Sequence, residues 1–218
     1  MSTQGKSGQE SAIISILSQE RMLPYFEVCG GSWGKALRLY EWNIHISSAL
    51  YEALSVAEIA LRNALDTQLT QLFSTPHVPW YDNMSTLINS KALQDISQAK
   101  SRAFRSPKVP TPGRVVAELN LGFWRYLLAS RYETTLWTPA LKNAFPNLEN
   151  LSRKKVYETV SLVHTLRNRI AHHEAIYQRN LFEDLEVISN LVEWISTETS
   201  EWMHRFEVIN DVLGQRPL

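Results

Sequence analysis

Two arginines, an amide, two imidazoles and a carboxylate lie within nine residues of this 218-residue chain, in the stretch Leu166-Arg167-Asn168-Arg169-Ile170-Ala171-His172-His173-Glu174. An arginine carries a permanent charge on a planar group that fits the oxygens of a phosphate. A histidine gains or loses its proton near neutral pH, which suits general acid–base catalysis. The combination predicts a site that holds a phosphodiester and cleaves it without a metal ion.

A helix is expected to carry this stretch. Apolar residues recur along it at spacings of four, three, three and four, namely Val156, Val160, Val163, Leu166 and Ile170, which is typical of an amphipathic helix. On a regular helix a residue five positions along is turned by about 140°, so Arg167 and His172 would not face one point. Either the helix is distorted there, or two copies of the stretch meet.

The separation of Arg167 and His172, with Asn168 directly after the arginine, resembles the Arg-polar-x-x-x-His signature of the HEPN superfamily of all-helical ribonucleases. The segment from Arg167 to Glu174 resembles the abortive-infection (Abi-like) branch of that superfamily. Three more segments resemble the same branch: Leu39-Tyr40-Glu41-Trp42-Asn43, Glu58-Ile59-Ala60-Leu61-Arg62-Asn63 and Glu118-Leu119-Asn120-Leu121-Gly122-Phe123-Trp124. The resemblance covers residues 10 to 200 in the order of the family.

The resemblance implies an HEPN-like helical bundle and a metal-independent endoribonuclease that acts in phage defence by abortive infection, like a toxin. Relatives build one composite site from two chains, so it also implies a homodimer. RNA is the implied substrate, and an antitoxin or a phage trigger the implied regulator. Some members of the superfamily are inert RNA-binding or scaffold modules, and this is the alternative function.

Each residue of the motif has an expected role in cleavage of RNA by its own 2′-hydroxyl. His172 would be the general acid or base, Arg167 would hold the non-bridging oxygens, and Asn168 would orient the imidazole or bind phosphate. His173 is the second choice for the catalytic imidazole. The reaction needs both a base and an acid, and a two-fold axis would bring a second histidine. Supporting residues are expected to be His173, Arg169, Glu174, Glu58, Arg62 and Asn63.

Other interpretations of the same residues stay open. The stretch could be a polar helix end in which Arg169 and His173, four apart, face each other. His164, His172, His173 and Glu174 could bind a metal, but adjacent residues on a helix point about 100° apart, unlike the i, i+4 histidines of helical zinc sites. We therefore expect no metal or cofactor. Seven Trp and eight Tyr would also suit a structural subunit with an aromatic protein interface.

The formal net charge is +0, so no overall field attracts nucleic acid and any RNA affinity must be local. The best candidate for an RNA path is a segment without acidic residues between Ile96 and Ala117, with Phe104 as a base-stacking side chain. Its cations are Lys100, Arg102, Arg105, Lys108 and Arg114. A solvated loop explains them equally well. From Glu183 to Asp211 there are eight carboxylates and one cation, so RNA should run elsewhere.

The remaining composition indicates a soluble cytoplasmic protein. The single cysteine, Cys29, excludes an internal disulfide and fits a reducing compartment. The longest early apolar run, from Ala12 to Leu17, is too short for a signal-peptide core or a membrane span. No association with a membrane is therefore expected.

The periodicity predicts helices only. They cover residues 11–22, 33–73, 87–104, 114–131, 138–145, a helix from about 152, and a helix that begins with a capping box at Asn180 and Glu183. A polar stripe on the helix 33–73, which contains Glu58 and Arg62, would lie beside Arg167 if the resemblance holds. Residues 1–10 are expected to be a disordered tail. With no dividing linker, residues 11–210 should form a single all-α domain, an HEPN-like bundle with extra N-terminal and middle helices.

Overall fold

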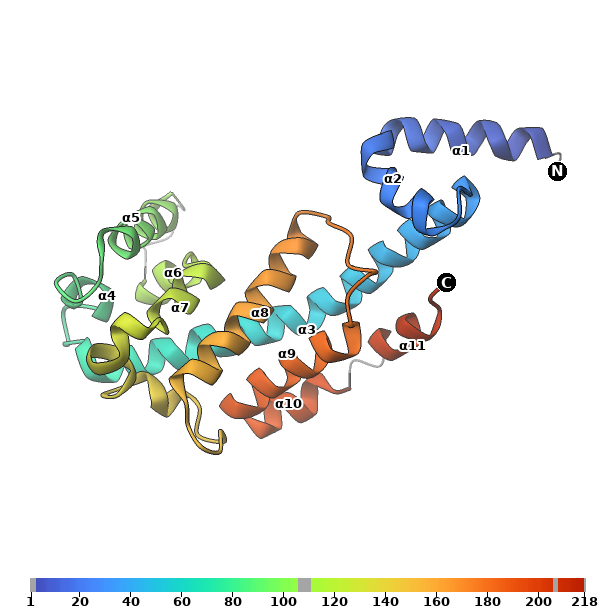
Figure 1. The fold of residues 1–218 in the computed structure, drawn as a ribbon. Coiled ribbons are helices and arrows are strands. Elements are labelled where there is room, and N and C mark those ends of the chain that lie inside the picture. Colours follow the sequence, from blue (N-terminus) through green and yellow to red (C-terminus); the bar gives the residue numbers. More distant parts are fainter. Residues whose placement is uncertain (1–2, 106–110, 206–207, 218) are drawn as a thin grey trace. The chain divides into compact units, whose positions relative to one another are not determined.

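The computed structural model describes residues 3–105, 111–205 and 208–217, and for residues 3–7 the backbone only. Every regular element in these ranges is a helix (Figure 1), so the prediction of an all-α fold is confirmed. The α-helices are α1 (Thr3–Leu17), α2 (Gln19–Val28), α3 (Trp33–Phe73), α4 (Trp80–Asn83), α5 (Ser90–Phe104), α6 (Pro112–Ala117), α7 (Leu121–Leu127), α8 (Arg153–Ala171), α9 (Leu181–Ile195), α10 (Thr197–Met203) and α11 (Val208–Gly214). Between α7 and α8 lie the 3₁₀ helix η1 (Ser130–Tyr132), the π-helical turn η2 (Glu133–Trp137) and the 3₁₀ helix η3 (Leu141–Ala144).

The chain forms two compact units, and neither is continuous in sequence. Unit 1 combines the described residues of 1–52, 169–181 and 206–218, and unit 2 those of 53–168 and 182–205. Two helices therefore contribute to both units: α3 changes unit after Glu52, and α8 changes unit after Asn168. The second change divides the stretch from Arg167 to Glu174, here called the Arg/His motif: Arg167 and Asn168 belong to unit 2, and the residues from Arg169 onward belong to unit 1.

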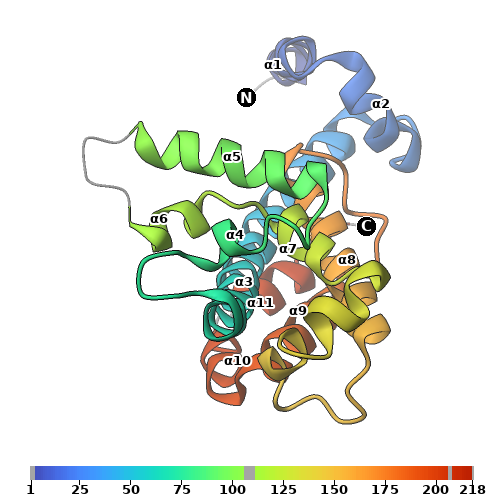
Figure 2. The same cartoon turned by 90° about the vertical axis from the view of Figure 1, so that its left-hand side faces the viewer.

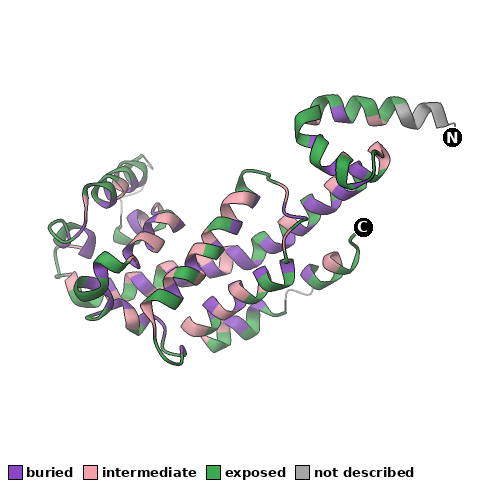
Figure 3. Ribbon diagram, in the orientation of Figure 1, coloured by how far each residue is buried: buried purple, intermediate pink, exposed green. Residues whose placement is uncertain are grey.

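The core of unit 2 is built from the apolar stripes that the sequence predicted. Leu54, Leu61 and Leu65 of α3 are fully buried, and so are Val156 and Val160 of α8. Purple bands repeat along both helices in Figure 3. Three aromatic rings, those of Trp80, Phe123 and Trp124, pack with centroids 5.2 to 6.3 Å apart. Helix α5 packs on α6 and α7 (Figures 1 and 2), which closes this side of the unit.

Aromatic contacts also hold unit 1 together. The ring of Tyr25 in α2 lies 5.2 Å from that of Tyr40 in α3 and 4.8 Å from that of Tyr177, in the segment after α8. The indole N–H of Trp42 donates a 2.7 Å hydrogen bond to the carbonyl of Val212 in α11. Helices α2, α3 and α11 and the segment after α8 therefore share contacts, although they are far apart in sequence.

Several elements differ from the sequence prediction. The helix expected over residues 114–131 is divided into α6 and α7, because the side chain of Asn120 accepts a hydrogen bond from the N–H of Phe123 and starts a new helix. The helix expected over residues 11–22 is broken at Ser18, and Pro24 lies inside α2. Helix α1 begins at Thr3, within the segment 1–10 for which a tail was expected.

Helix α3 is long and apolar enough, by length and composition, to cross a membrane. The core helix of a soluble protein meets the same criterion. In this structure 39% of its most apolar window is buried against the rest of the chain, and its half-buried face carries Glu58 and Arg62. The structure thus gives α3 a packing role within each unit.

Candidate functional site

Arg167 occupies the last turns of α8 and is held by a carboxylate from α3. Its Nε lies 3.4 Å from Oε2 of Glu58, and the two side chains are 32% and 25% exposed. The i, i+4 spacing of Glu58 and Arg62 would allow a pair within α3, but Arg62 donates to the side chain of Asn63 instead, at 3.3 Å. Glu58 thus faces α8, and the polar stripe of α3 restricts how the Arg167 guanidinium can point.

Asn168 is held by a histidine, His164, that the sequence analysis named only in the alternative metal site. The amide Nδ2 of Asn168 lies 3.3 Å from Nε2 of His164, one turn earlier on α8. Burial lowers the pKa of His164, and the positive charges of Arg125 and Arg167 lower it further, against an opposing effect of Glu58. A neutral imidazole can accept the amide hydrogen. The i, i+4 spacing of residues 164 and 168 was the signal that could have identified the pair.

Two residues of α7 complete the surroundings of His164. A Cβ added to Gly122 would lie 3.2 Å from Nε2 of His164 and 3.1 Å from Oδ1 of Asn120, closer than most real contacts. A side chain at position 122 would therefore displace the imidazole or the helix cap. Arg125 lies with its guanidinium 5.9 Å from the ring centroid of Tyr157, and its buried Nε has no hydrogen-bond partner among the described residues. Unit 2 thus gathers two arginines, a histidine and an amide around one end of α8.

The other half of the motif forms the C-terminal cap of α8. The helix ends at Ala171, the N–H of His173 donates to the carbonyl of Ile170 at 3.0 Å, and that of Glu174 donates to the carbonyl of Arg169 at 2.8 Å. His173 has a φ of 56°. This is the Schellman pattern, in which the left-handed position is usually glycine. His172 lies beyond the regular helix and is exposed, so the rotation of a continuous helix no longer applies to it.

Two side chains from other elements of unit 1 fix this cap. Nη1 of Arg21 in α2 donates to the carbonyl of His173 at 2.7 Å. Oδ1 of Asn43, buried in α3, accepts from the N–H of Ile176 at 2.8 Å. Asn43 belongs to one of the segments that resemble the Abi-like branch, and its structural task is to anchor the chain that follows the motif. Arg169 and Glu174 lie 3.7 Å apart and are 42% and 52% exposed.

The basic segment is less open than its sequence suggests. Lys100 forms an ion pair with Asp82 and lies 5.2 Å from the ring centroid of Tyr81. Arg102 pairs with the Glu118 side chain at 2.9 Å and also donates to its carbonyl at 2.7 Å. These carboxylates come from outside the segment, so the local absence of acidic residues did not indicate free cations. Arg105 is exposed, Arg114 is half-buried, and Lys108 lies outside the described residues.

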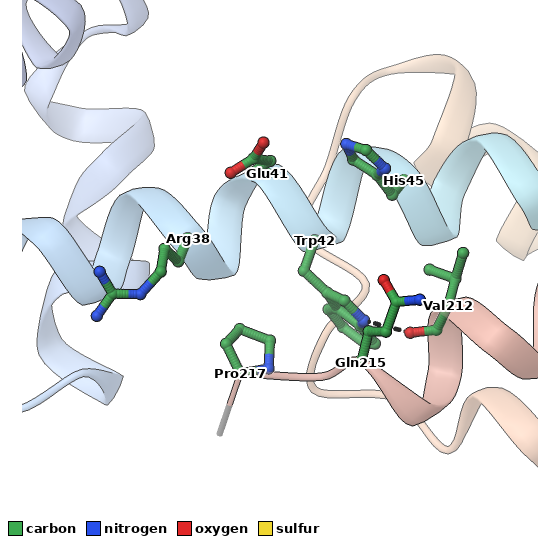
Figure 4. A pocket seen from close by; sticks show the side chains of 7 residues that line it. All are labelled: Arg38, Glu41, Trp42, His45, Val212, Gln215 and Pro217. Atoms are coloured by element: carbon green, nitrogen blue, oxygen red, sulfur yellow. Dashed lines mark hydrogen bonds between the residues drawn. The ribbon is translucent and has the colours of Figure 1, made fainter.

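A separate pocket of about 250 Å³ lies in unit 1 around Trp42 (Figure 4). Arg38, Glu41 and His45 of α3 form one wall, and the C-terminal segment supplies Val212, Gln215 and Pro217. The indole N–H points at the carbonyl of Val212, as the dashed line in Figure 4 indicates. The indole N–H of Trp42 in this pocket is therefore already bonded to the C-terminal segment.

The chemical capacity of the motif is that of a phosphate-handling site with proton donors. It offers guanidinium groups for non-bridging oxygens and exposed imidazoles for proton transfer. No group of three His, Cys, Asp or Glu side chains gathers for a metal within the ranges that the structure describes. Comparison of the chain with protein-family models, with curated proteins and with solved structures found no match.

Proposed function

We propose that this protein is a metal-independent endoribonuclease of the Abi-like branch of the HEPN superfamily, acting like a toxin in phage defence. The observation that carries the proposal is that one short stretch contains two restrained side chains and an exposed imidazole. Arg167 is held by Glu58 and Asn168 by His164, whereas His172 lies exposed just past the helix end. A restrained cation and an accessible imidazole, five residues apart in the sequence, suit a charged, polymeric substrate.

The reaction is an internal transesterification of RNA. The 2′-oxygen bonds to phosphorus, the bond from phosphorus to the 5′-oxygen breaks, and the products are a 2′,3′-cyclic phosphate and a free 5′-hydroxyl. A base takes the 2′ proton and an acid protonates the leaving oxygen, each step contributing roughly 10²–10⁴-fold. His172 serves one of these roles, and Arg167 offsets the charge that grows on the non-bridging oxygens.

A second copy of the chain supplies the second proton carrier in this proposal. Each chain exposes two adjacent imidazoles after α8, His172 and His173, of which the proposal uses His172, and a two-fold axis would place two copies of His172 around one phosphate. Light scattering at micromolar concentration tests this feature. A mass that stays at the 25.0 kDa of one chain at all concentrations would contradict the composite site.

The central experiment compares three purified variants on a labelled RNA, in EDTA. His172→Ala should abolish cleavage and leave RNA affinity nearly intact, because a neutral imidazole adds little to phosphate binding. Arg167→Ala should impair both, since its charge contacts phosphate in the ground state and in the transition state. His173→Ala identifies the imidazole: if it alone abolishes cleavage, His172 was the wrong choice. Melting curves exclude unfolding.

The alternative is an inert RNA-binding or scaffold module of the same superfamily, and one observation favours it. Arg167, Lys100 and Arg102 are each paired with a carboxylate, which reduces the positive potential available to RNA. A parent protein that binds RNA but cleaves none, with and without EDTA, would favour the scaffold. Cleavage that needs one added divalent ion would instead favour a metal site.

A further inference from the structure

A groove of about 630 Å³ runs along the cap of α8 within unit 1. Its walls are the start of α2, with Ser18, Glu20 and Arg21, and the end of the motif, with Arg169, His173 and Glu174. This volume lies within the range of small-molecule sites. The second half of the motif therefore lines a groove that the cleavage chemistry of Arg167 and His172 does not use.

Strained backbone meets on both walls of the groove. Ser18 has a φ of 71° and His173 a φ of 56°, and left-handed conformations cost non-glycine residues free energy. Such residues persist where the surroundings enforce them, and they gather at ligand-binding positions. The bond from Arg21 to the carbonyl of His173 ties the two walls together. The groove is thus a built feature, with its geometry fixed before a ligand arrives.

The floor of the groove is rigid as well. Tyr25 and Tyr177 line it and are almost fully buried. The hydroxyl of Tyr177 donates to the carbonyl of Pro24 at 3.1 Å and accepts from the Gln178 amide at 3.1 Å. Burial raises the pKa of Tyr25, so its hydroxyl keeps its proton. The two tyrosines thus support the groove from beneath and present almost no surface of their own to a ligand.

The charges of the groove argue against a simple phosphate site. Two arginines (Arg21 and Arg169) and two glutamates (Glu20 and Glu174) line it, so their formal charges sum to zero. A phosphate would meet two carboxylates in the same cavity, which is unfavourable. The ion pair of Arg169 and Glu174 is loose, at 3.7 Å, so most of their hydrogen-bonding capacity is free for a ligand. The groove suits a neutral group with both donors and acceptors.

The donor and acceptor pattern selects among the bases of RNA. A carboxylate is only an acceptor and needs two adjacent donors to bind in a bidentate manner, whereas a guanidinium needs two adjacent acceptors. Guanine has adjacent donors at N1 and N2 and adjacent acceptors at O6 and N7, and the second pair is the usual partner of arginine. Adenine, cytosine and uracil lack the pair of adjacent donors. Exposed Glu174 and Arg169 together match guanine.

We propose that this groove binds one unpaired guanine of the RNA substrate, with Glu174 on its N1 and N2 edge and Arg169 on O6 and N7. Arg21 then fixes the cap rather than reading the base, because its Nη1 is committed to His173. The inference depends on the proposed function for the identity of the ligand as RNA. It adds a sequence preference, which the Arg167–His172 pair alone does not supply.

Fluorescence anisotropy with the full chain carrying His172→Ala tests the proposal without cleavage of the probe. The probes are labelled six-nucleotide uridine RNAs with guanine, inosine, 7-deazaguanine or adenine at one central position. Guanine should bind about tenfold more tightly than the other three, because inosine lacks the N2 donor and 7-deazaguanine lacks the N7 acceptor. Glu174→Gln should remove the difference between guanine and inosine. Glu186→Gln, an exposed change on α9, should keep it.

Two results would overturn the guanine site. The first is equal affinity for all four probes. If inorganic phosphate then competes, the protein binds the RNA backbone. The second is a guanine preference that remains unchanged in both Glu174→Gln and Arg169→Met, with melting curves to confirm that the variants are folded. Failure of the proposed function gives a different result from failure of the guanine site. The parent chain would then bind the guanine probe most tightly but cleave none of the probes.

Discussion

Two helix ends in unit 1, those of α2 and α8, have the same capping hydrogen bonds but different residues in the left-handed conformation. At the end of α2 the N–H groups of Gly30 and Gly31 donate to the carbonyls of Glu27 and Phe26. At the end of α8 the N–H groups of His173 and Glu174 donate to the carbonyls of Ile170 and Arg169 in the same pattern. The left-handed residue is Gly30, with φ 64°, in the first case and His173, with φ 56°, in the second.

This difference separates a cap whose left-handed residue is unstrained from a cap that retains strain. Glycine adopts the left-handed conformation without a steric penalty, whereas a histidine there is destabilising. The chain uses glycine where the turn has only to end a helix. At α8 it retains an imidazole at a cost to stability, and there the cap lies within the motif and lines a groove. Stability measurements on matched variants can test this difference between the two caps.

The largest effect is expected at the glycine cap. Gly30→Val places a β-branched side chain at a φ of 64° and should cost about 1–2 kcal/mol, which lowers the melting temperature by roughly 2–8 °C. No atom lies within 4 Å of an added Cβ, so the loss would come from the backbone alone. Gly30→Asn is the control and should cost much less, since asparagine tolerates this conformation. Equal losses would show that the conformation is not the cause.

The reciprocal change at the other cap should stabilise the protein. His173→Gly relieves the left-handed strain and should add about 0.5–1 kcal/mol, seen as a rise of roughly 1–4 °C in thermal unfolding. Ala171→Gly, two residues earlier at the end of α8, should lower the melting temperature, because glycine is unfavourable within a helix. A loss of stability in His173→Gly would mean that its imidazole, rather than its backbone, holds the cap.

A smaller effect is expected from the residue that ties the cap to α2. Arg21→Met removes the hydrogen bond to the carbonyl of His173; since the arginine is exposed, the loss should be about 0.5–1 kcal/mol. Arg38→Met, an exposed change on α3, is the matched control and should be nearly neutral. Equal melting temperatures for the two variants would show that Arg21 does not stabilise the cap.

The smallest effect is expected from His164 in unit 2, and it is a dependence of the free energy of unfolding on pH. The pKa of His164 is lowered from 6.5 by burial and by Arg125 and Arg167. Between the lowered pKa and 6.5 the unfolded chain binds a proton that the folded chain does not, so stability falls as the pH falls through this range. His164→Asn should flatten the decline in melting temperature below about pH 6.5. Thr165→Asn, an exposed neighbour, should keep the slope of the parent.

Local patterns predicted the parts of the fold that local interactions determine. The stripes of α3 and α8 have strong periodicity, and both helices formed where expected. The helix expected over residues 114–131 was wrong in its continuity, because a capping side chain at Asn120 outweighed an unbroken apolar pattern. The Arg/His stretch was selected by residue types and spacing, and its role as a site stays a prediction.

The parts of the site that depend on distant segments could not be predicted in this way. Glu58 was expected near Arg167 only through the resemblance, whereas Arg21 had no such signal because it contacts the cap through the backbone of His173. The pairing of Lys100 with Asp82 and of Arg102 with Glu118 also joins separate segments. The left-handed conformation of His173 could not be predicted from the sequence, because glycine, and not histidine, is the residue typical of this position.

The alternation of the two units along the chain has a consequence for anyone who wishes to study half of this protein. Each unit recruits segments from both sides of the other, and each boundary within α3 and α8 falls inside a continuous helix. No single cut yields a fragment with one whole unit, and a cut at either boundary also severs a helix. Expression of one isolated unit, or its exchange between related genes, would therefore need separate segments to be joined in a new order, and neither truncation nor circular permutation alone would be enough.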